Sequence, residues 1–314
     1  MLGRTANGLF WMFRYLERAE NTARLLEAAL RMALTRDVVT AEAEWRSVIA
    51  TLGLTQAYQA AHDGYDGVSV WNFVLRGSGN PGNVRSMFGA VRSNARMART
   101  NISSDVWEAV NENWMRIDKL LARPVSQGAV GEALAAIRRA GTQVHGAFDG
   151  SILRDEGYHF ARAGTFIERA DSSARILDMK YFLLLPSLSY VGSSLDTGQW
   201  EQVLRSVAGA RAYSWLNAGQ IEARGIVEFV VLDERFPRSL AFCRSALRDC
   251  LGALARAHGG EGRAVALSRE ADTRIGNLTV DQIFEAGLHE FLVDFLARNN
   301  AIAQAIAADY RFHA

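Results

Sequence analysis

The chain has 314 residues, enough for one or two domains with a hydrophobic core that needs no disulfide or metal to hold it together. Hydrophobic residues make up 49% and charged residues 22%, as in an ordinary globular protein. The formal net charge of +1 lacks the basic excess typical of nucleic-acid-binding proteins, so we expect no nucleic-acid partner.

The first predicted element is a helix that starts near residue 9, where apolar residues recur at steps of three and four. Asn7 is its expected N-cap. The apolar run 9–13 is too short to span a bilayer, and it lacks the basic leader and cleavage site of a secretory signal. We therefore expect a cytoplasmic protein that makes no membrane contact.

Residues 67–75 and 225–232 are rich in β-branched and aromatic side chains and could form strands. A sheet would need partner strands, and the sequence offers none, so a helix is favoured for both segments. Each proline stands where a helical pattern stops, which is typical of loops. The prolines are Pro81, Pro124, Pro186 and Pro237. The predicted loops are residues 77–82, 123–128, 186–198 and 259–262.

Further helices are predicted over residues 129–140 and 284–308, which are rich in Ala and Leu. Capping boxes are expected where Asp105 precedes Glu108 and where Thr279 precedes Gln282. Most of the dispersed tryptophans lie at helical core spacing, which favours buried positions. Cys243 and Cys250 lie seven residues apart, about 10 Å along a helix, which is too far for a disulfide and suits reduced thiols in the cytosol.

A tandem duplication is the clearest internal signal. Residues 17–27 reappear as residues 168–178, and every exchange between the two segments is chemically conservative. Later landmarks follow in nearly the same register. They pair Trp45 with Trp200, Tyr58 with Tyr213, Phe73 with Phe229, Arg92 with Arg248, and Trp107 with Phe284. The repeats span about residues 1–150 and 151–314. Because repeats often share one core, we expect a single all-α helical bundle domain over residues 1–314.

The repeated segment carries Glu-Arg pairs whose charges flank the apolar stripe of the helix. Three interpretations remain open. The charges could form ordinary helix-surface ion pairs, worth about 0.2–0.5 kcal/mol each. They could pair reciprocally between the repeats, Glu17 with Arg169 and Glu168 with Arg18, or they could line the floor of a groove that binds a charged ligand. The candidate residues are Glu17, Arg18, Arg24, Glu168, Arg169 and Arg175.

A second candidate is a basic strip at helical spacing, formed by Arg92, Arg96 and Arg99. Three guanidinium groups on one strip could hold a carboxylate or a phosphate. The alternative is a solvated basic face paired with acids of a neighbouring helix. Arg248 alone keeps its place in the second repeat, which favours a task for the first repeat.

The sequence contains no complete catalytic or metal-binding pattern. Glu156 and His159 have the Glu-x-x-His spacing of carboxylate-bridged metal sites in helical bundles, but no second copy occurs. The glycine-rich residues 77–82 lack the Lys-Ser/Thr ending of a phosphate-binding loop. We therefore assign no catalytic residue, no metal and no cofactor.

The opening residues 4–24 read RTANGLFWMFRYLERAENTAR and resemble the signature of the bacterial Alpha-E family. Residues 91–96, 102–108, 154–160 and 236–240 resemble it as well, so the resemblance covers essentially the whole chain. Tyr158 and Asn94 depart from the family pattern, which usually has Trp and an acidic residue there. The resemblance implies an all-helical protein with a Glu-Arg motif.

The resemblance also implies a partner, because Alpha-E proteins are typically encoded beside, or fused to, a circularly permuted ATP-grasp protein. A transglutaminase-like protein is often encoded nearby. We therefore expect an accessory or substrate-holding partner of an ATP-grasp amidoligase in a peptide-forming or peptide-modifying system. The alternatives are a helical transferase or hydrolase that acts on the ligase product, with Glu17 or Glu168 as base, and a homo-oligomeric scaffold.

Overall fold

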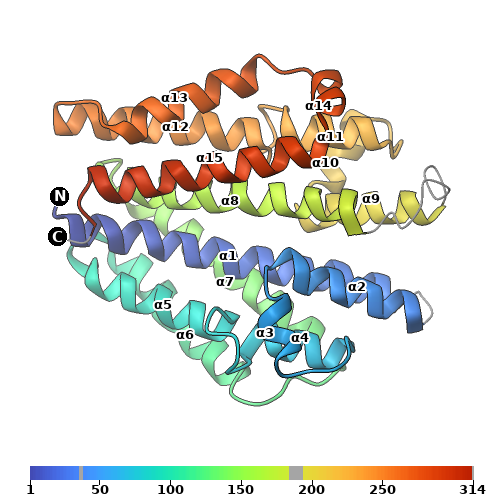
Figure 1. Cartoon of the computed structure of the whole chain (residues 1–314). Coiled ribbons are helices and arrows are strands. Elements are labelled where there is room, and N and C mark those ends of the chain that lie inside the picture. The colour runs from blue at the N-terminus through green and yellow to red at the C-terminus, as the bar shows by residue number, and fades with distance from the viewer. Residues whose placement is uncertain (35–37, 184–193, 313–314) are drawn as a thin grey trace. The chain divides into compact units, whose positions relative to one another are not determined.

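The computed structural model describes residues 1–34, 38–183 and 194–312, which form α-helices, one 3-10 helix and no strand (Figure 1). The all-α prediction is therefore confirmed for the described residues. These residues divide into two compact units, of which unit 1 comprises residues 1–14 and 153–314 and unit 2 comprises residues 15–152. Helix α1 (Gly3–Ala33) begins in unit 1 and continues into unit 2.

Unit 1 is built around four long helices. Helix α8 packs against both α12 and α15, and α13 packs against the same two helices, which closes a four-helix arrangement (Figure 1). The shorter helices pack at one end, where α11 contacts α8, α9, α12 and α14. The helices that follow α1 in this unit are α8 (Glu156–Leu183), α9 (Ser194–Ser206), α10 (Ala210–Leu216), α11 (Ala223–Val231), α12 (Leu240–His258), α13 (Arg263–Gly276), α14 (Val280–Ala286) and α15 (Leu288–Asp309).

Unit 2 contains the rest of α1 and the helices up to residue 151. Helix α6 packs between α5 and α7, and α4 contacts both α2 and α5. Ion pairs within the unit join α1 to α7. The remaining elements are α2 (Val38–Thr51), α3 (Thr55–Gln59), α4 (Gly67–Arg76), α5 (Val84–Met97), the 3-10 helix η1 (Arg99–Asn101), α6 (Ser104–Leu120) and α7 (Val130–Ser151).

The two segments with strand-like composition are helices, α4 and α11, as favoured from the sequence. Their β-branched and aromatic residues recur at helical spacing, so that Val70, Phe73 and Val74 are buried on one side of α4. The Asp66 side chain caps α4 by accepting a hydrogen bond from the Ser69 N–H at 2.9 Å. Burial of a helical face therefore prevails over β propensity.

The predicted helix ends needed several corrections. Helix α1 begins at Gly3, so Asn7 lies inside the helix and is not its N-cap. The cap of α6 is Ser103, which accepts a hydrogen bond from the Val106 N–H, and not Asp105. The capping box of Thr279 and Gln282 is confirmed.

Loops are confirmed at residues 77–82, 123–128 and 259–262. The predicted loop 186–198 is wrong at its end, because residues 194–198 belong to α9. The rest of that loop up to residue 193, including Pro186, lies outside the described residues. The predicted helix 284–308 is interrupted at Gly287, whose φ of 90° ends α14 before α15 begins.

Both cysteines lie buried in α12 as free thiols, as predicted. Burial raises the pKa of the Cys250 thiol to about 12, so it remains protonated at neutral pH. Across the described residues, no helix combines the length and the apolar composition needed to cross a bilayer.

Candidate functional site

The glutamates of both Glu-Arg segments are almost completely buried: Glu17 is 0% exposed and Glu168 is 3% exposed. Burying a carboxylate is costly unless it is paired or hydrogen-bonded, so neither residue belongs to an ordinary helix-surface ion pair. That interpretation is wrong for the two glutamates. The two glutamates have different partners within their own units.

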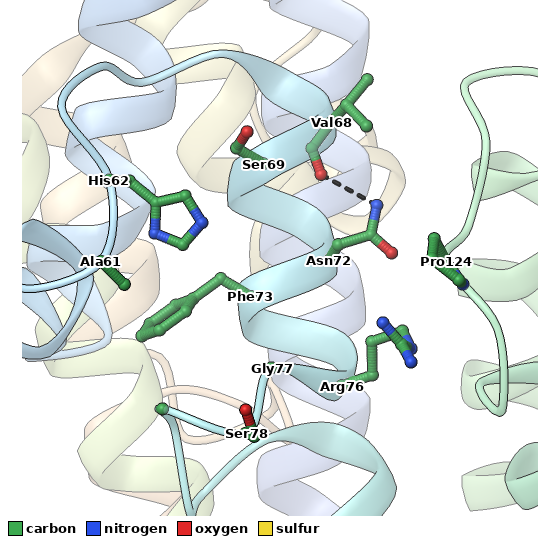
Figure 2. Close-up of a pocket in the computed structure, with 11 residues that line it drawn as sticks. Ala61, His62, Val68, Ser69, Asn72, Phe73, Arg76, Gly77, Ser78 and Pro124 are labelled. Carbon is green, nitrogen blue, oxygen red and sulfur yellow. Dashed lines mark hydrogen bonds between the residues drawn. The ribbon is translucent and has the colours of Figure 1, made fainter.

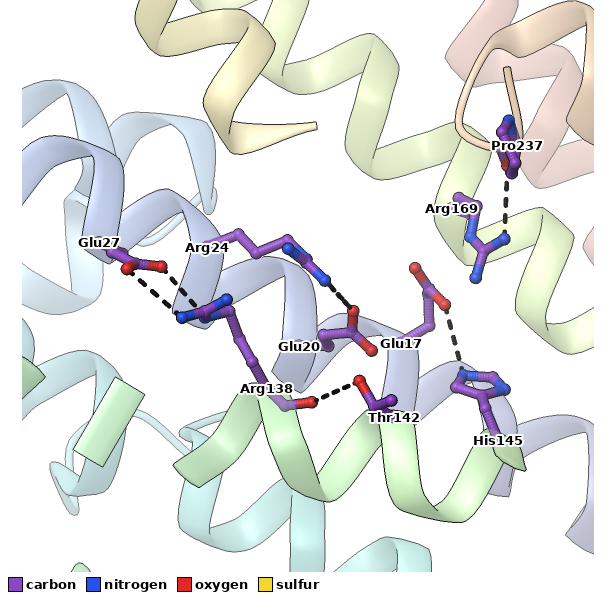
Figure 3. A network of polar contacts seen from close by, with 9 residues as sticks. All are labelled: Glu17, Glu20, Arg24, Glu27, Arg138, Thr142, His145, Arg169 and Pro237. Atoms are coloured by element: carbon purple, nitrogen blue, oxygen red, sulfur yellow. Dashed lines mark hydrogen bonds and ion pairs between the residues drawn. The ribbon is translucent and has the colours of Figure 1, made fainter. Parts of the chain in front are cut away.

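In unit 2, Glu17 lies in a cluster with Glu20 and His145 (Figure 3). The His145 Nε2 atom lies 3.6 Å from Glu17 Oε2, and one oxygen or nitrogen atom from each of the three side chains lies within 4.8 Å of the others. Glu17 and Glu20 are three residues apart on α1 and so share a face, while His145 comes from α7. His145 was not predicted from the sequence, because no motif links it to the Glu-Arg segment.

The contact between α1 and α7 at this cluster depends on Gly141. A Cβ atom at this position would lie 2.5 Å from Glu20 Oε2, so any larger residue would displace the Glu20 carboxylate. Arg24, one of the sequence candidates, binds the other oxygen of Glu20, with Nη2 2.6 Å from Oε1. Further along the same helices, Arg138 and Glu27 form an ion pair at 3.1 Å (Figure 3).

In unit 1, Glu168 pairs with a guanidinium group. Arg14 donates to Glu168 Oε2 through Nε at 3.0 Å, and Nη2 lies at the same distance. The guanidinium carbon of Arg14 also lies 4.5 Å from the centre of the Trp11 ring, a cation–π contact. Both charged side chains are largely buried, so this pair holds α8 against the start of α1.

The two arginines of the second Glu-Arg segment also make contacts within unit 1. Arg169 donates to the Pro237 carbonyl oxygen at 3.4 Å, and Arg175 donates to Asp171 at 2.7 Å one helical turn away. Arg18 is half-buried on α1. The reciprocal pairing of Glu17 with Arg169 and of Glu168 with Arg18 stays a prediction.

The three arginines of the basic strip do not all lie on one helix. Helix α5 ends at Met97, so Arg99 falls in η1, outside the helix that carries Arg92 and Arg96. Arg92 donates to Asn111 Oδ1 at 2.8 Å and lies over the Trp114 ring, at 4.2 Å from its centre. The partners that α6 offers to Arg92 are thus an amide and an aromatic ring rather than acids. Arg96 is exposed.

Unit 2 also contains a pocket of about 480 Å³ beside α4 (Figure 2). Two of its polar lining residues hold the end of α6 and the loop after it: Arg76 donates to the Leu121 carbonyl at 2.9 Å, and Asn72 exchanges hydrogen bonds with Val125. Unit 1 has a pocket of about 310 Å³ beside α11. That second pocket is more acidic, with Glu228 and Asp233 in its lining.

These features define an all-helical protein with a Glu-Arg segment on each of two long helices. The glutamates of both segments are buried. The chain belongs to the Alpha-E family, whose model matches residues 1–310 and describes a predicted alpha-helical domain with a conserved ER motif. Similar proteins include uncharacterized proteins of Mycobacterium bovis and Mycobacterium tuberculosis, each 26% identical over 97% of this chain. The chain spans 36% of the length of these relatives. No solved structure matches the chain.

Proposed function

We propose that this chain is a helical partner of an ATP-grasp amidoligase, which it docks or supplies with a peptide or amine substrate. The supporting observation is the length of the mycobacterial relatives, in which the matching segment is 36% of a longer chain. In those proteins the Alpha-E segment is covalently joined to further polypeptide. A segment that is joined to further polypeptide in its relatives is suited to work together with another folded part. The identity of that partner rests on the family resemblance.

An exposed aromatic residue in unit 1 offers a docking point for the partner. The Trp215 side chain on α10 is 79% exposed, and its neighbour Leu216 is 49% exposed. This position departs from the expected core location of the tryptophans. Tryptophans that become buried in an interface often contribute much of the binding free energy, because the transfer of a large apolar ring out of water is favourable. We infer that the ATP-grasp partner covers Trp215.

We also infer that the chain arose by tandem duplication. Helices α1 to α7 match α8 to α13 and α15 in order, with α14 as an insertion. Both units pack a buried tyrosine edge-on against a phenylalanine: the ring centres of Tyr58 and Phe73 are 5.2 Å apart, and those of Tyr213 and Phe229 are 5.5 Å apart. The sequence match of Trp107 with Phe284 does not fit this order, because it would pair α6 with α14.

The burial of both glutamates weighs against the enzyme alternative. A general base must come within hydrogen-bond distance of the proton that it abstracts. Glu17 is fully buried, and Glu168 is paired with Arg14. A substrate would have to displace these contacts to reach either carboxylate. A partner protein needs no such displacement, because it can bind the surface.

The proposal is tested by mixing the purified chain with the ATP-grasp protein of the same organism and measuring the mass and affinity of the complex. We expect a stoichiometric complex that Trp215→Ala weakens by about 30-fold or more, the usual effect of an interface hot spot. Leu153→Ala is the matched control, since Leu153 is equally exposed at 81% and belongs to the same unit. Absence of a complex would contradict the proposal, and a self-associated oligomer of this chain alone would favour the scaffold.

A further inference from the structure

We propose that Glu17, Glu20 and His145 bind a divalent metal ion of the zinc or manganese class. The proposal concerns unit 2 alone and does not depend on the ligase partnership. Carboxylate oxygen and imidazole nitrogen are the protein ligands that these ions share. Three such groups converge here from two helices, and each offers one atom within 4.8 Å of the other two.

The separation between Glu17 and His145 is that expected for two ligands of one ion. Ligand atoms at about 2.0–2.2 Å from a metal lie roughly 3–3.5 Å from each other in tetrahedral or octahedral geometry. The observed distance from His145 Nε2 to Glu17 Oε2 is 3.6 Å, longer than the 2.7–3.2 Å that is usual for a hydrogen bond. The ligand atom of Glu20 lies within 4.8 Å of those of Glu17 and His145.

A contrasting pair elsewhere in the protein shows what direct pairing looks like. In unit 1, His289 Nδ1 lies 2.6 Å from Asp178 Oδ1, a direct contact between imidazole and carboxylate. That pair has one carboxylate and is partly exposed. The cluster in unit 2 has two carboxylates, both almost completely buried. Among the residues that the structure describes, no third ligand side chain converges on His289 and Asp178, so this pair provides a control of the same chemistry.

The contacts around the cluster hold the Glu20 ligand in place. Gly141 allows the Glu20 carboxylate to lie against α7, since a Cβ atom there would come within 2.5 Å of Oε2. Arg24 holds the other Glu20 oxygen at 2.6 Å and orients the carboxylate. The Thr142 hydroxyl donates to the Arg138 carbonyl on its own helix at 3.2 Å (Figure 3). With three protein ligands, the remaining coordination positions would be taken by water.

The experiment measures Zn²⁺ and Mn²⁺ binding to the metal-free full chain by calorimetry, with metal content checked by elemental analysis after dialysis. We expect about one ion per chain for at least one of the two metals. His145→Gln and Glu20→Gln should each weaken binding by at least about 100-fold, since even outer-shell changes cost 10–100-fold. His289→Gln should leave the affinity unchanged. Circular dichroism of each variant confirms that the helices are intact.

Failure of the wild-type chain to bind either ion would overturn the proposal, as would a His145→Gln variant that binds as well as the wild type. If His145→Gln and Glu20→Gln both fail to fold, Co²⁺ is added to the His289→Gln chain instead. The proposal then requires a visible Co²⁺ absorption band, at one equivalent, that Zn²⁺ abolishes. Absence of that band would count against the site as decisively as the absence of zinc binding.

Discussion

The two Glu-Arg segments show how one sequence pattern leads to two different environments. Glu168 in unit 1 accepts from the guanidinium group of Arg14, which is always charged and can only donate. Glu17 in unit 2 lies beside His145, whose imidazole can act as donor, acceptor or metal ligand. The first pair can serve only as a structural link. The second brings together the ligand types of the proposed metal site, so the two similar segments place their glutamates in chemically different surroundings.

The largest effect is expected from breaking the pair in unit 1. Glu168→Gln would leave the Arg14 guanidinium largely buried without a counter-charge, and removing one partner of a buried pair typically costs about 3–5 kcal/mol. Asp171→Asn is the control, because the more exposed pair of Asp171 with Arg175 should contribute less than about 1 kcal/mol. Urea unfolding curves measure both values. Equal costs for the two variants would show that Glu168 is no structural link.

The next largest effect concerns the close contact of α1 and α7 in unit 2. Gly141→Ala would push a Cβ atom against Glu20 and should destabilise the protein by about 1–3 kcal/mol, the usual cost of overpacking. Gly146→Ala on the same helix meets nothing within 4 Å and should stabilise it by up to about 1 kcal/mol. Thermal unfolding measures the two opposite shifts. Stabilisation by Gly141→Ala would contradict the described contact.

The smallest effect distinguishes the caps of α4 and α11. Asp66→Ala should cost about 1 kcal/mol, because Asp66 caps α4, whereas Glu222→Ala should cost almost nothing, because the Glu222 side chain makes no cap bond. Burial raises the pKa of Asp66, but the hydrogen bonds from Ser69, Val68 and the Asp66 backbone together outweigh it and hold the pKa below its usual range. The contribution of Asp66 is therefore present above the pKa of the unfolded state and is lost as the pH falls through the lower pKa of the folded state. Urea unfolding of wild type and Asp66→Ala should give converging stabilities at acid pH.

Helix positions were predictable from the sequence wherever an apolar stripe was long. The stripe of α1 and the spacing of Val70, Phe73 and Val74 in α4 correctly indicate helices, because a buried face has the period of the helix itself. Helix ends were less predictable. Asn7 has the chemistry of a cap, but α1 extends to Gly3, and Gly287 interrupts the C-terminal helix although the Ala- and Leu-rich pattern continues.

Only part of the candidate site could be predicted from the sequence. Glu17 and Glu20 belong to a repeated segment that stands out by itself, whereas His145 is a single histidine in an otherwise ordinary amphipathic helix. Its role depends on which face of α7 lies against α1, and that is set by tertiary packing at Gly141. Tertiary packing also sets the contacts of Arg92 in the basic strip, since Trp114 and Asn111 on another helix engage it.

Thermal unfolding of wild type, His145→Gln and Glu168→Gln, each with and without Zn²⁺, tests most directly whether the two glutamates have diverged in role. At a zinc concentration about 100 times the dissociation constant, binding should stabilise the folded chain by about 2.7 kcal/mol. We predict that zinc raises the melting temperature of the wild type and of the destabilised Glu168→Gln variant, but not that of His145→Gln. Equal zinc-induced shifts in all three proteins, or a wild type whose melting temperature is raised by neither Zn²⁺ nor Mn²⁺, would contradict this account.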